Sequence, residues 1–216
     1  MAQRSAPDPI DFASLLCSRL CHDLLSPVGA LNNGIELITD ETDPQVREQC
    51  IDLLGDSARI TAGKLKFFRL AFGAAGGFGE AVPVHEIRGA LEGLFPPGGK
   101  LELQWMIAGE SLPKPAAKLL LNLVMLAGEA LPRGGTLAIG AEQGAGGTEI
   151  AVRGEGMRIT FDPVIRAALE RDGGDVTSRT APAFMIRSLA SQCGGQILVS
   201  PAGEPFLMFG AHLPTT

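Results

Sequence analysis

Two long amphipathic segments joined by a short polar turn constrain the fold of this chain more than any other feature of its sequence. Both begin with an aspartate that can cap a helix and a proline at the first helical position, Asp8-Pro9 and Asp43-Pro44. The first segment runs to about Thr39 and repeats apolar residues at steps of three and four, as in a coiled coil or helix bundle. Its apolar stripe consists of Leu20, Leu24, Pro27 or Val28, Leu31, Ile35 and Ile38.

The second segment carries an equivalent stripe, which predicts a second long helix. A helix that turns ~100° per residue brings one set of residues to a single face: Cys50, Leu54, Ala58, Thr61, Leu65, Phe68 and Phe72. Residues 40–42 allow only a tight turn between the two helices, so we expect an antiparallel hairpin. A hairpin alone leaves one side of each stripe in water. The sequence therefore predicts a homodimer in which two hairpins make a four-helix bundle.

The chain after the hairpin alternates between helical and strand patterns. Residues 73–79 are mostly glycine and alanine, a composition typical of a flexible linker, and a second domain begins near Glu80. The predicted fold class is α+β, with a helical hairpin in residues 1–75 and an α/β sandwich in residues 80–216, its helices on one face of the sheet. Helices are expected at residues 84–94, 115–131 and 181–192, and strands at 101–107, 136–140, 149–153, 196–200 and 206–212.

The composition excludes several classes of partner. The chain is 45% hydrophobic, which is enough for a core, and its net charge of −6 with 5% aromatic residues argues against binding to nucleic acid. The longest apolar stretches, such as residues 119–126, are too short to span a membrane, and residues 1–9 lack the pattern of a signal peptide. We therefore expect a cytoplasmic protein that binds neither nucleic acid nor membrane.

His22 lies on the predicted first helix, opposite the apolar stripe and on the same face as Arg19, Ser26 and Asn33. A histidine that packs in a core would lie on the stripe instead. An exposed histidine followed by an acid, here Asp23, is a candidate phosphoryl acceptor, general base or metal ligand.

Pro27 lies within the same predicted helix. Its ring removes a backbone donor and clashes with the carbonyl four residues earlier. The sequence therefore predicts a break in helix geometry just after the histidine.

The cysteines do not indicate a metal site. Cys17 and Cys21 are one helical turn apart just before His22, so metal binding is one interpretation, but neither zinc-ligand spacing nor a haem-type CxxCH motif is present. Packing as small hydrophobic side chains is favoured, and Cys17 projects onto the apolar stripe. His85 and His212 have no cluster of potential ligands near them in the sequence, which favours structural roles.

The run from His22 to Glu36 resembles the H-box of the dimerisation and histidine-phosphotransfer domain of sensor histidine kinases. The shared pattern is His-acid-x-x-Ser/Thr-Pro on the exposed face of a long helix, formed here by His22, Asp23, Ser26 and Pro27. The second domain resembles the ATP-binding domain of the same kinases, the GHKL type, in the order and spacing of its elements.

The nucleotide motifs of that domain are eroded in this sequence. Residues 122–127 occupy the N-box, but Leu126 replaces the asparagine that holds magnesium, and leucine offers no oxygen ligand. In the Asp-x-Gly-x-Gly box, Gly154 replaces the adenine-binding aspartate and Arg158 replaces the later glycine. Residues 177–186 show no glycine-rich phosphate loop. These three losses predict that the chain does not bind ATP.

A phosphotransfer hairpin joined to a kinase-like domain without nucleotide motifs resembles the ChpT-type histidine phosphotransferases of alphaproteobacterial cell-cycle phosphorelays. The resemblance implies a homodimer that takes a phosphoryl group from the receiver domain of a hybrid histidine kinase. It also implies transfer onward to response regulators of the CtrA and CpdR types, through a phosphohistidine at His22.

Under this resemblance, His22 attacks the aspartyl phosphate of a receiver through one ring nitrogen, which we expect to be Nε2. Asp23 would accept a hydrogen bond from the other nitrogen and orient the imidazole. The chain would bring no cofactor or metal of its own, because Mg²⁺ comes from the acidic pocket of the receiver. Arg19 could add positive charge near the phosphate or simply pair with Asp23, and Ser26 could bond the phosphate or only help to bend the helix. Lys64, on the second helix, is interpreted as part of a solvated face.

Two other functions fit parts of the sequence. A divergent ATP-using histidine kinase would bind nucleotide with magnesium, which Leu126 and Gly154 argue against. A non-catalytic adaptor that binds receivers would keep its activity when His22 is replaced by alanine. A metal-dependent hydrolase ranks third, because no second histidine or carboxylate cluster accompanies His22 at helical ligand spacing.

Overall fold

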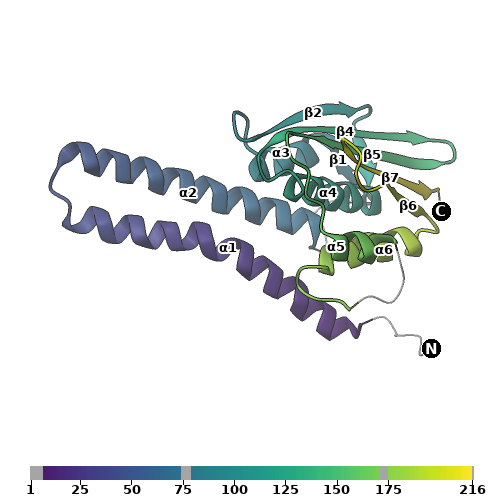
Figure 1. The fold of residues 1–216 in the computed structure, drawn as a ribbon, viewed down its shortest axis with the longest axis horizontal. Helices are drawn as coiled ribbons and strands as arrows, with labels where there is room; N and C mark the ends of the chain where they lie inside the picture. The colour runs from purple at the N-terminus through teal and green to yellow at the C-terminus, as the bar shows by residue number, and fades with distance from the viewer. Residues whose placement is uncertain (1–6, 74–78, 171–174, 216) are drawn as a thin grey trace.

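Helices α1 (Pro9–Asp40) and α2 (Pro44–Ala71) form an antiparallel hairpin that extends away from the rest of the molecule (Figure 1). The computed structural model describes residues 7–73, 79–170 and 175–215. Both predicted helix starts are confirmed. The Asp8 carboxylate accepts a hydrogen bond from the backbone N–H of Ile10 at 2.8 Å, and the Asp43 carboxylate accepts one from Gln45 at 2.8 Å.

Helix α1 bends but is not interrupted. It continues as one α-helix through Pro27, which is buried, and Figure 1 shows it changing direction between its two ends. A proline removes a single backbone donor, so a helix can continue past it with a bend. The predicted break in helix geometry therefore takes the form of a curved helix rather than two separate ones.

The rest of the described chain is a mixed sheet with helices packed on one of its faces (Figure 1), which confirms the predicted α+β class. The sheet order is β2-β4-β5-β7-β6; β2 and β4 are parallel, and the other neighbouring pairs are antiparallel. Strands β1 and β3 pair separately. The elements are β1 (Ala81–Pro83), α3 (Val84–Leu94), β2 (Leu101–Ile107), β3 (Ser111–Pro113), α4 (Lys114–Glu129), β4 (Gly135–Gly144), β5 (Gly147–Glu155), α5 (Pro163–Glu170), α6 (Ala181–Gln192), β6 (Gln196–Val199) and β7 (Leu207–Pro214).

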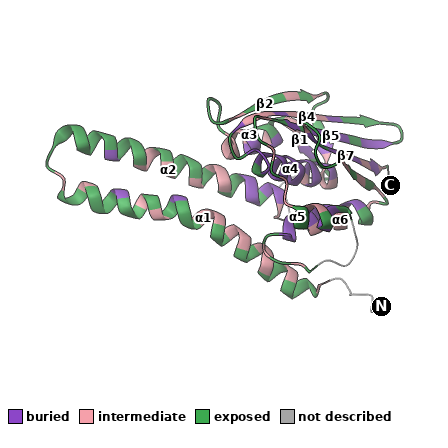
Figure 2. Ribbon diagram, viewed as in Figure 1, coloured by how far each residue is buried: buried purple, intermediate pink, exposed green. Residues whose placement is uncertain are grey.

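Helix α4 lies at the centre of the core, and the last turns of α2 pack against it (Figure 2). Phe67, Phe68, Leu70 and Ala71 of α2 are buried in the same apolar cluster as α4. The C-terminal end of α2 is thus part of the core of the sandwich. Of the predicted glycine-rich linker, residues 74–78 lie outside the described residues, and the domain boundary there stays a prediction. None of the helices in the described ranges has the length and apolar character of a membrane span.

A glycine contact fixes the closest approach between α2 and α3. A Cβ atom added at Gly63 would run into the backbone carbonyl of Gly93, which cannot move without shifting α3. Gly63→Ala should therefore lower the free energy of unfolding by about 1–3 kcal/mol. Gly55→Ala on the same helix is the matched control, because its Cβ would meet only the end of the Arg59 side chain at 3.6 Å. That change should raise stability by up to about 1 kcal/mol.

Chemical denaturation of the two variants beside the wild type measures both effects. Equal stabilities for Gly63→Ala and Gly55→Ala would contradict the close helix contact.

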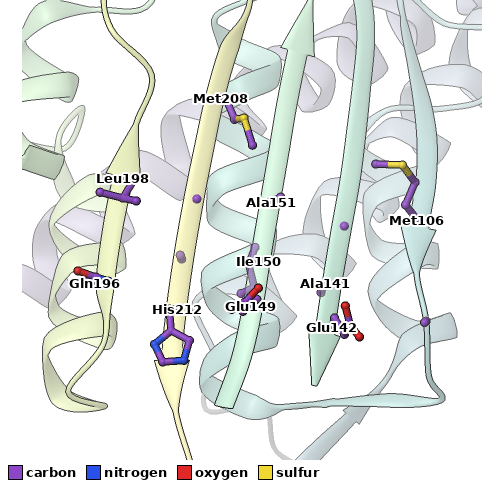
Figure 3. A pocket seen from close by; sticks show the side chains of 14 residues that line it. Met106, Ala141, Glu142, Glu149, Ile150, Ala151, Gln196, Leu198, Met208 and His212 are labelled. Carbon is purple, nitrogen blue, oxygen red and sulfur yellow. The ribbon is translucent and has the colours of Figure 1, made fainter. Parts of the chain in front are cut away.

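The face of the sheet turned away from the helices holds an open hollow of about 460 Å³ (Figure 3). Its floor is a row of small residues paired across the three central strands, Gly140, Ala151 and Gly210. Met106 and Leu198, on the two outer strands of the same row, stand at its sides. The hollow lies on the far side of the sheet from the hairpin, so it takes no part in the arrangement around His22.

Candidate functional site

His22 projects from α1 into solvent. Its side chain is 84% exposed, whereas Pro27 and Gly34 of the same helix are buried. The side chain of Leu54 on α2 lies so close to Gly34 that an added Cβ would come within 2.8 Å of it. The imidazole is therefore open to a partner molecule, as the helical position of His22 predicts.

The imidazole of His22 is oriented by its neighbour in the sequence. Its Nδ1 lies 3.1 Å from Oδ1 of Asp23, and the Asp23 side chain is only 20% exposed. A carboxylate at this distance accepts a hydrogen bond from a protonated Nδ1 and so favours the tautomer whose Nε2 carries a lone pair. This arrangement puts the lone pair on Nε2 of a side chain that is largely exposed.

Asp23 is itself held from two sides. Arg19 donates from Nε to Oδ2 of Asp23 at 2.8 Å, and Lys64 of α2 donates from Nζ to the backbone carbonyl of Asp23 at 2.7 Å. The interpretation of Lys64 as part of a solvated face is therefore wrong. It ties α2 to the turn of α1 that carries His22.

Arg19 also reaches the second half of the chain. Its Nη2 donates to Oε1 of Glu129, the last residue of α4. Burial lowers the pKa of Arg19, but the carboxylates of Glu129 and Asp23 outweigh that effect and raise it overall. Burial raises the pKa of Glu129 above its usual value, against the opposing charge of Arg19. The charge of Arg19 is thus matched by two carboxylates, which favours its pairing role over direct contact with phosphate.

Ser26 is exposed one turn after His22 on α1. Its position leaves both predicted roles open, a bond to phosphate or a contribution to the bend. Cys17 and Cys21 are exposed too, so neither packs as a small hydrophobic side chain within the single chain. Cys50, by contrast, is buried between the hairpin helices.

Two residues at the kinase-like nucleotide motifs are buried: one is apolar, and the other is an amide whose Oδ1 has no hydrogen-bond partner among the described residues. Leu126 is 1% exposed, and its carbon side chain offers nothing to a cation. Asn122 is fully buried and donates from Nδ2 to the backbone carbonyls of Ala71 at 3.3 Å and Lys118 at 2.8 Å. Leu126 thus supplies no ligand for magnesium at the position where the kinases hold it, and Asn122 is enclosed in the core.

A small pocket of about 200 Å³ lies between α1 and the end of α4. It is lined by Leu126 and Glu129 of α4, by Arg19 of α1, and by Asp162 and Arg179, which form an ion pair with each other. The charged side chains of the pocket therefore form two ion pairs, Arg19 with Glu129 and Arg179 with Asp162. Within the described residues, no group of three or more His, Cys, Asp and Glu side chains is placed to hold a metal ion.

Sequence reasoning identified His22, Asp23, Ser26 and Arg19, which the structure brings together on adjacent turns of α1. It missed Glu129, which is separated from Arg19 by 110 residues. No local pattern distinguishes this glutamate, because its role depends on how α4 packs beside α1.

Comparisons with known proteins agree with one another. Residues 84–205 match the family model described as the histidine phosphotransferase C-terminal domain. The chain is 33% identical over 208 residues to the protein phosphotransferase ChpT of Brucella abortus (strain 2308), covering 94% of this chain and 96% of that protein. A solved structure of a bacterial phosphotransferase aligns with a TM-score of 0.84 and 29% identity, covering 98% of this chain and all of the other.

Proposed function

The chain belongs to the histidine phosphotransferase family, and we propose that it carries phosphoryl groups between receiver-domain aspartates through a phosphohistidine at His22. The observation that carries this proposal is the geometry of the imidazole. His22 is 84% exposed, and its Nδ1 lies 3.1 Å from the Asp23 carboxylate, which leaves Nε2 free to attack.

The transfer step needs only this side chain and a phosphorylated partner. The lone pair of His22 Nε2 attacks the phosphorus of an aspartyl phosphate. A P–N bond forms as the P–O bond to the aspartate breaks, and the electron pair leaves with that carboxylate. The ring becomes positively charged, and the Asp23 carboxylate beside Nδ1 stabilises that charge. The same bond changes in reverse pass the phosphoryl group to the next receiver.

The partners follow from this chemistry and from the resemblance. Receiver domains supply the aspartyl phosphate and, in their acidic pocket, the Mg²⁺ that neutralises the phosphoryl oxygens. The chain then needs no cofactor or metal of its own. We take the donor to be the receiver of a hybrid histidine kinase and the acceptors to be response regulators of the CtrA and CpdR types, in the cytoplasm.

A homodimer is the expected assembly. Apolar side chains of the hairpin remain in water in the single chain, which a second hairpin would cover. Val28 and Ile35, two turns apart on one side of α1, are 40% and 54% exposed. The other large apolar side chains exposed on α1 and α2 are Ile10, Leu25, Leu37, Val46, Ile51, Leu53, Ile60 and Leu65.

Labelled phosphate from two sources tests the function. The purified protein receives radiolabelled ATP with Mg²⁺ in one tube and a pre-phosphorylated receiver domain in another. We expect label on the protein from the receiver alone, since Leu126 and Gly154 replace the residues that hold magnesium and adenine in the kinases. Label from ATP would make the chain a kinase. Binding of a receiver panel without label from any member would favour the adaptor function.

Asp23→Asn should slow the transfer. The amide keeps the shape of the side chain but removes the negative charge that stabilises the imidazolium and selects the tautomer. Loss of a charge-assisted hydrogen bond corresponds to a single-turnover rate lower by about 10- to 100-fold. Rapid-quench measurement from a phosphorylated receiver reports this rate directly. A rate equal to that of the wild type would show that Asp23 does not act on the ring.

A further inference from the structure

A continuous line of polar contacts connects His22 to the core helix of the sandwich. Glu129 accepts a hydrogen bond from Nη2 of Arg19, Arg19 donates from Nε to Oδ2 of Asp23 at 2.8 Å, and Oδ1 of Asp23 lies 3.1 Å from Nδ1 of His22. The first residue of this line belongs to α4 and the other three to α1.

The shape of the Arg19 guanidinium links its contact with Glu129 to its contact with Asp23. Its guanidinium is planar and rigid, so fixing Nη2 on Glu129 also fixes the direction in which Nε points. Its side chain is only 14% exposed, and water screens the contacts weakly there. Without Glu129, Arg19 would keep only an i,i+4 partner on its own helix, an interaction worth little by itself.

Glu129 is the last residue of the helix at the centre of the core. Residues on both sides of it, Gly128 and Ala130, are buried, and α4 forms the centre of the core. A second contact holds the same half of α1 to the sandwich, where the rings of Phe12 and Phe184 meet edge to face with centroids 5.1 Å apart. The segment before His22 is therefore anchored on the sandwich, and Glu129 contacts it through Arg19, about one helical turn before the acceptor.

We propose that Glu129 is a positioning residue for phosphoryl transfer, acting through Arg19 to hold the Asp23 carboxylate against the imidazole of His22. The inference rests on the proposed role of His22. It gives the sandwich a part in the reaction that needs no nucleotide, namely to fix the tautomer and the direction of a side chain on the neighbouring hairpin.

The alternative is that Glu129 only ties two parts of the fold together. A double-mutant cycle separates the two roles. Glu129→Ala should slow single-turnover transfer from a phosphorylated receiver about tenfold, at saturating receiver. In a chain that already carries Asp23→Ala, Glu129→Ala should cause no further slowing, because nothing remains for Arg19 to orient. Equal slowing in both backgrounds would overturn the proposal.

Two further variants make the result specific. Glu129→Gln keeps an acceptor oxygen for Arg19 and should recover most of the lost rate. Glu170→Ala removes a comparable ion pair, with Arg166, in the same half of the chain, and it should leave the rate at the wild-type value. Circular dichroism melting of each variant checks that the fold is retained.

The tautomer of His22 gives a readout that does not depend on transfer. Nitrogen-15 NMR of the wild-type imidazole should show the Nδ1-protonated form, and Glu129→Ala should shift it towards a mixture of both forms. An unchanged spectrum and an unchanged rate in Glu129→Ala, in a wild type that accepts phosphoryl groups, would overturn the inference alone. A wild type that accepts none would overturn the proposed function instead.

Discussion

Replacing His22 by alanine is expected to abolish all phosphoryl uptake from a phosphorylated receiver. Alanine has no lone pair to attack phosphorus, and the other two histidines of the chain, His85 and His212, lie on α3 and β7. Arg19 and Asp23, beside His22, are hydrogen-bonded to each other. The fold should not change, because an imidazole that is 84% exposed contributes little to packing.

His85→Ala is the matched control for this experiment. His85 also lies on a helix and is 79% exposed, but it is on α3, away from the Arg19–Asp23 pair. That variant should take up label at the wild-type rate. His22→Ala should still bind the receiver, which calorimetry or a pull-down with the purified domain can measure. Residual label on His22→Ala would place the phosphoryl acceptor elsewhere.

The helices of this chain were predictable where capping and periodicity agree. The Asp-Pro pairs predict the first residues of α1 and α2 correctly, since a side-chain cap and a fixed proline φ act within a few residues. Helix α5 was missed although Asp162-Pro163 repeats the same signal and Asp162 accepts from the N–H of Val164 at 2.7 Å. Strands β1 and β3 are three residues long, too short for an alternating pattern.

The local half of the site was predictable, and the tertiary half was not. His22 and Asp23 are adjacent, and Arg19 lies one helical turn before Asp23, so helix geometry alone brings them together. Glu129 and Lys64 reach the same turn from α4 and α2, over 110 and 41 residues of sequence. Such contacts depend on how whole helices pack. The sequence also could not show that Arg19 pairs with two carboxylates, which favours a pairing role for Arg19 over direct contact with phosphate.

The apolar periodicity predicts the stripes of α1 and α2. It does not indicate which of their residues pack within one hairpin and which remain for a second hairpin. Pro27, Gly34 and Cys50 are buried between the hairpin helices of a single chain. Ile35 and Leu65, from the same stripes, are 54% and 52% exposed. A helix in a bundle touches two neighbours, so its apolar face is wider than one contact requires. The exposed part is what the proposed four-helix bundle would bury.

Ile35→Lys is therefore expected to dissociate the dimer. A twofold axis places both copies of a residue at the same interface, so a single substitution buries two unpaired ammonium groups. A penalty of about 3 kcal/mol corresponds to a dissociation constant raised by about 100-fold. Asn33→Lys is the control, because ~100° per residue puts Asn33 on the opposite side of α1 from Ile35, beside His22. It adds the same charge and should leave the dimer intact.

Sedimentation equilibrium over a range of concentrations measures both constants. A wild type that stays monomeric would contradict the bundle, and an Ile35→Lys variant as dimeric as Asn33→Lys would move the interface to another face of the hairpin. The line from Glu129 to His22 lies entirely within one chain. An Ile35→Lys monomer that keeps its hairpin folded should consequently retain the Nδ1-protonated tautomer of His22, which separates the role of the sandwich in orienting the imidazole from the role of the dimer in stabilising the hairpin.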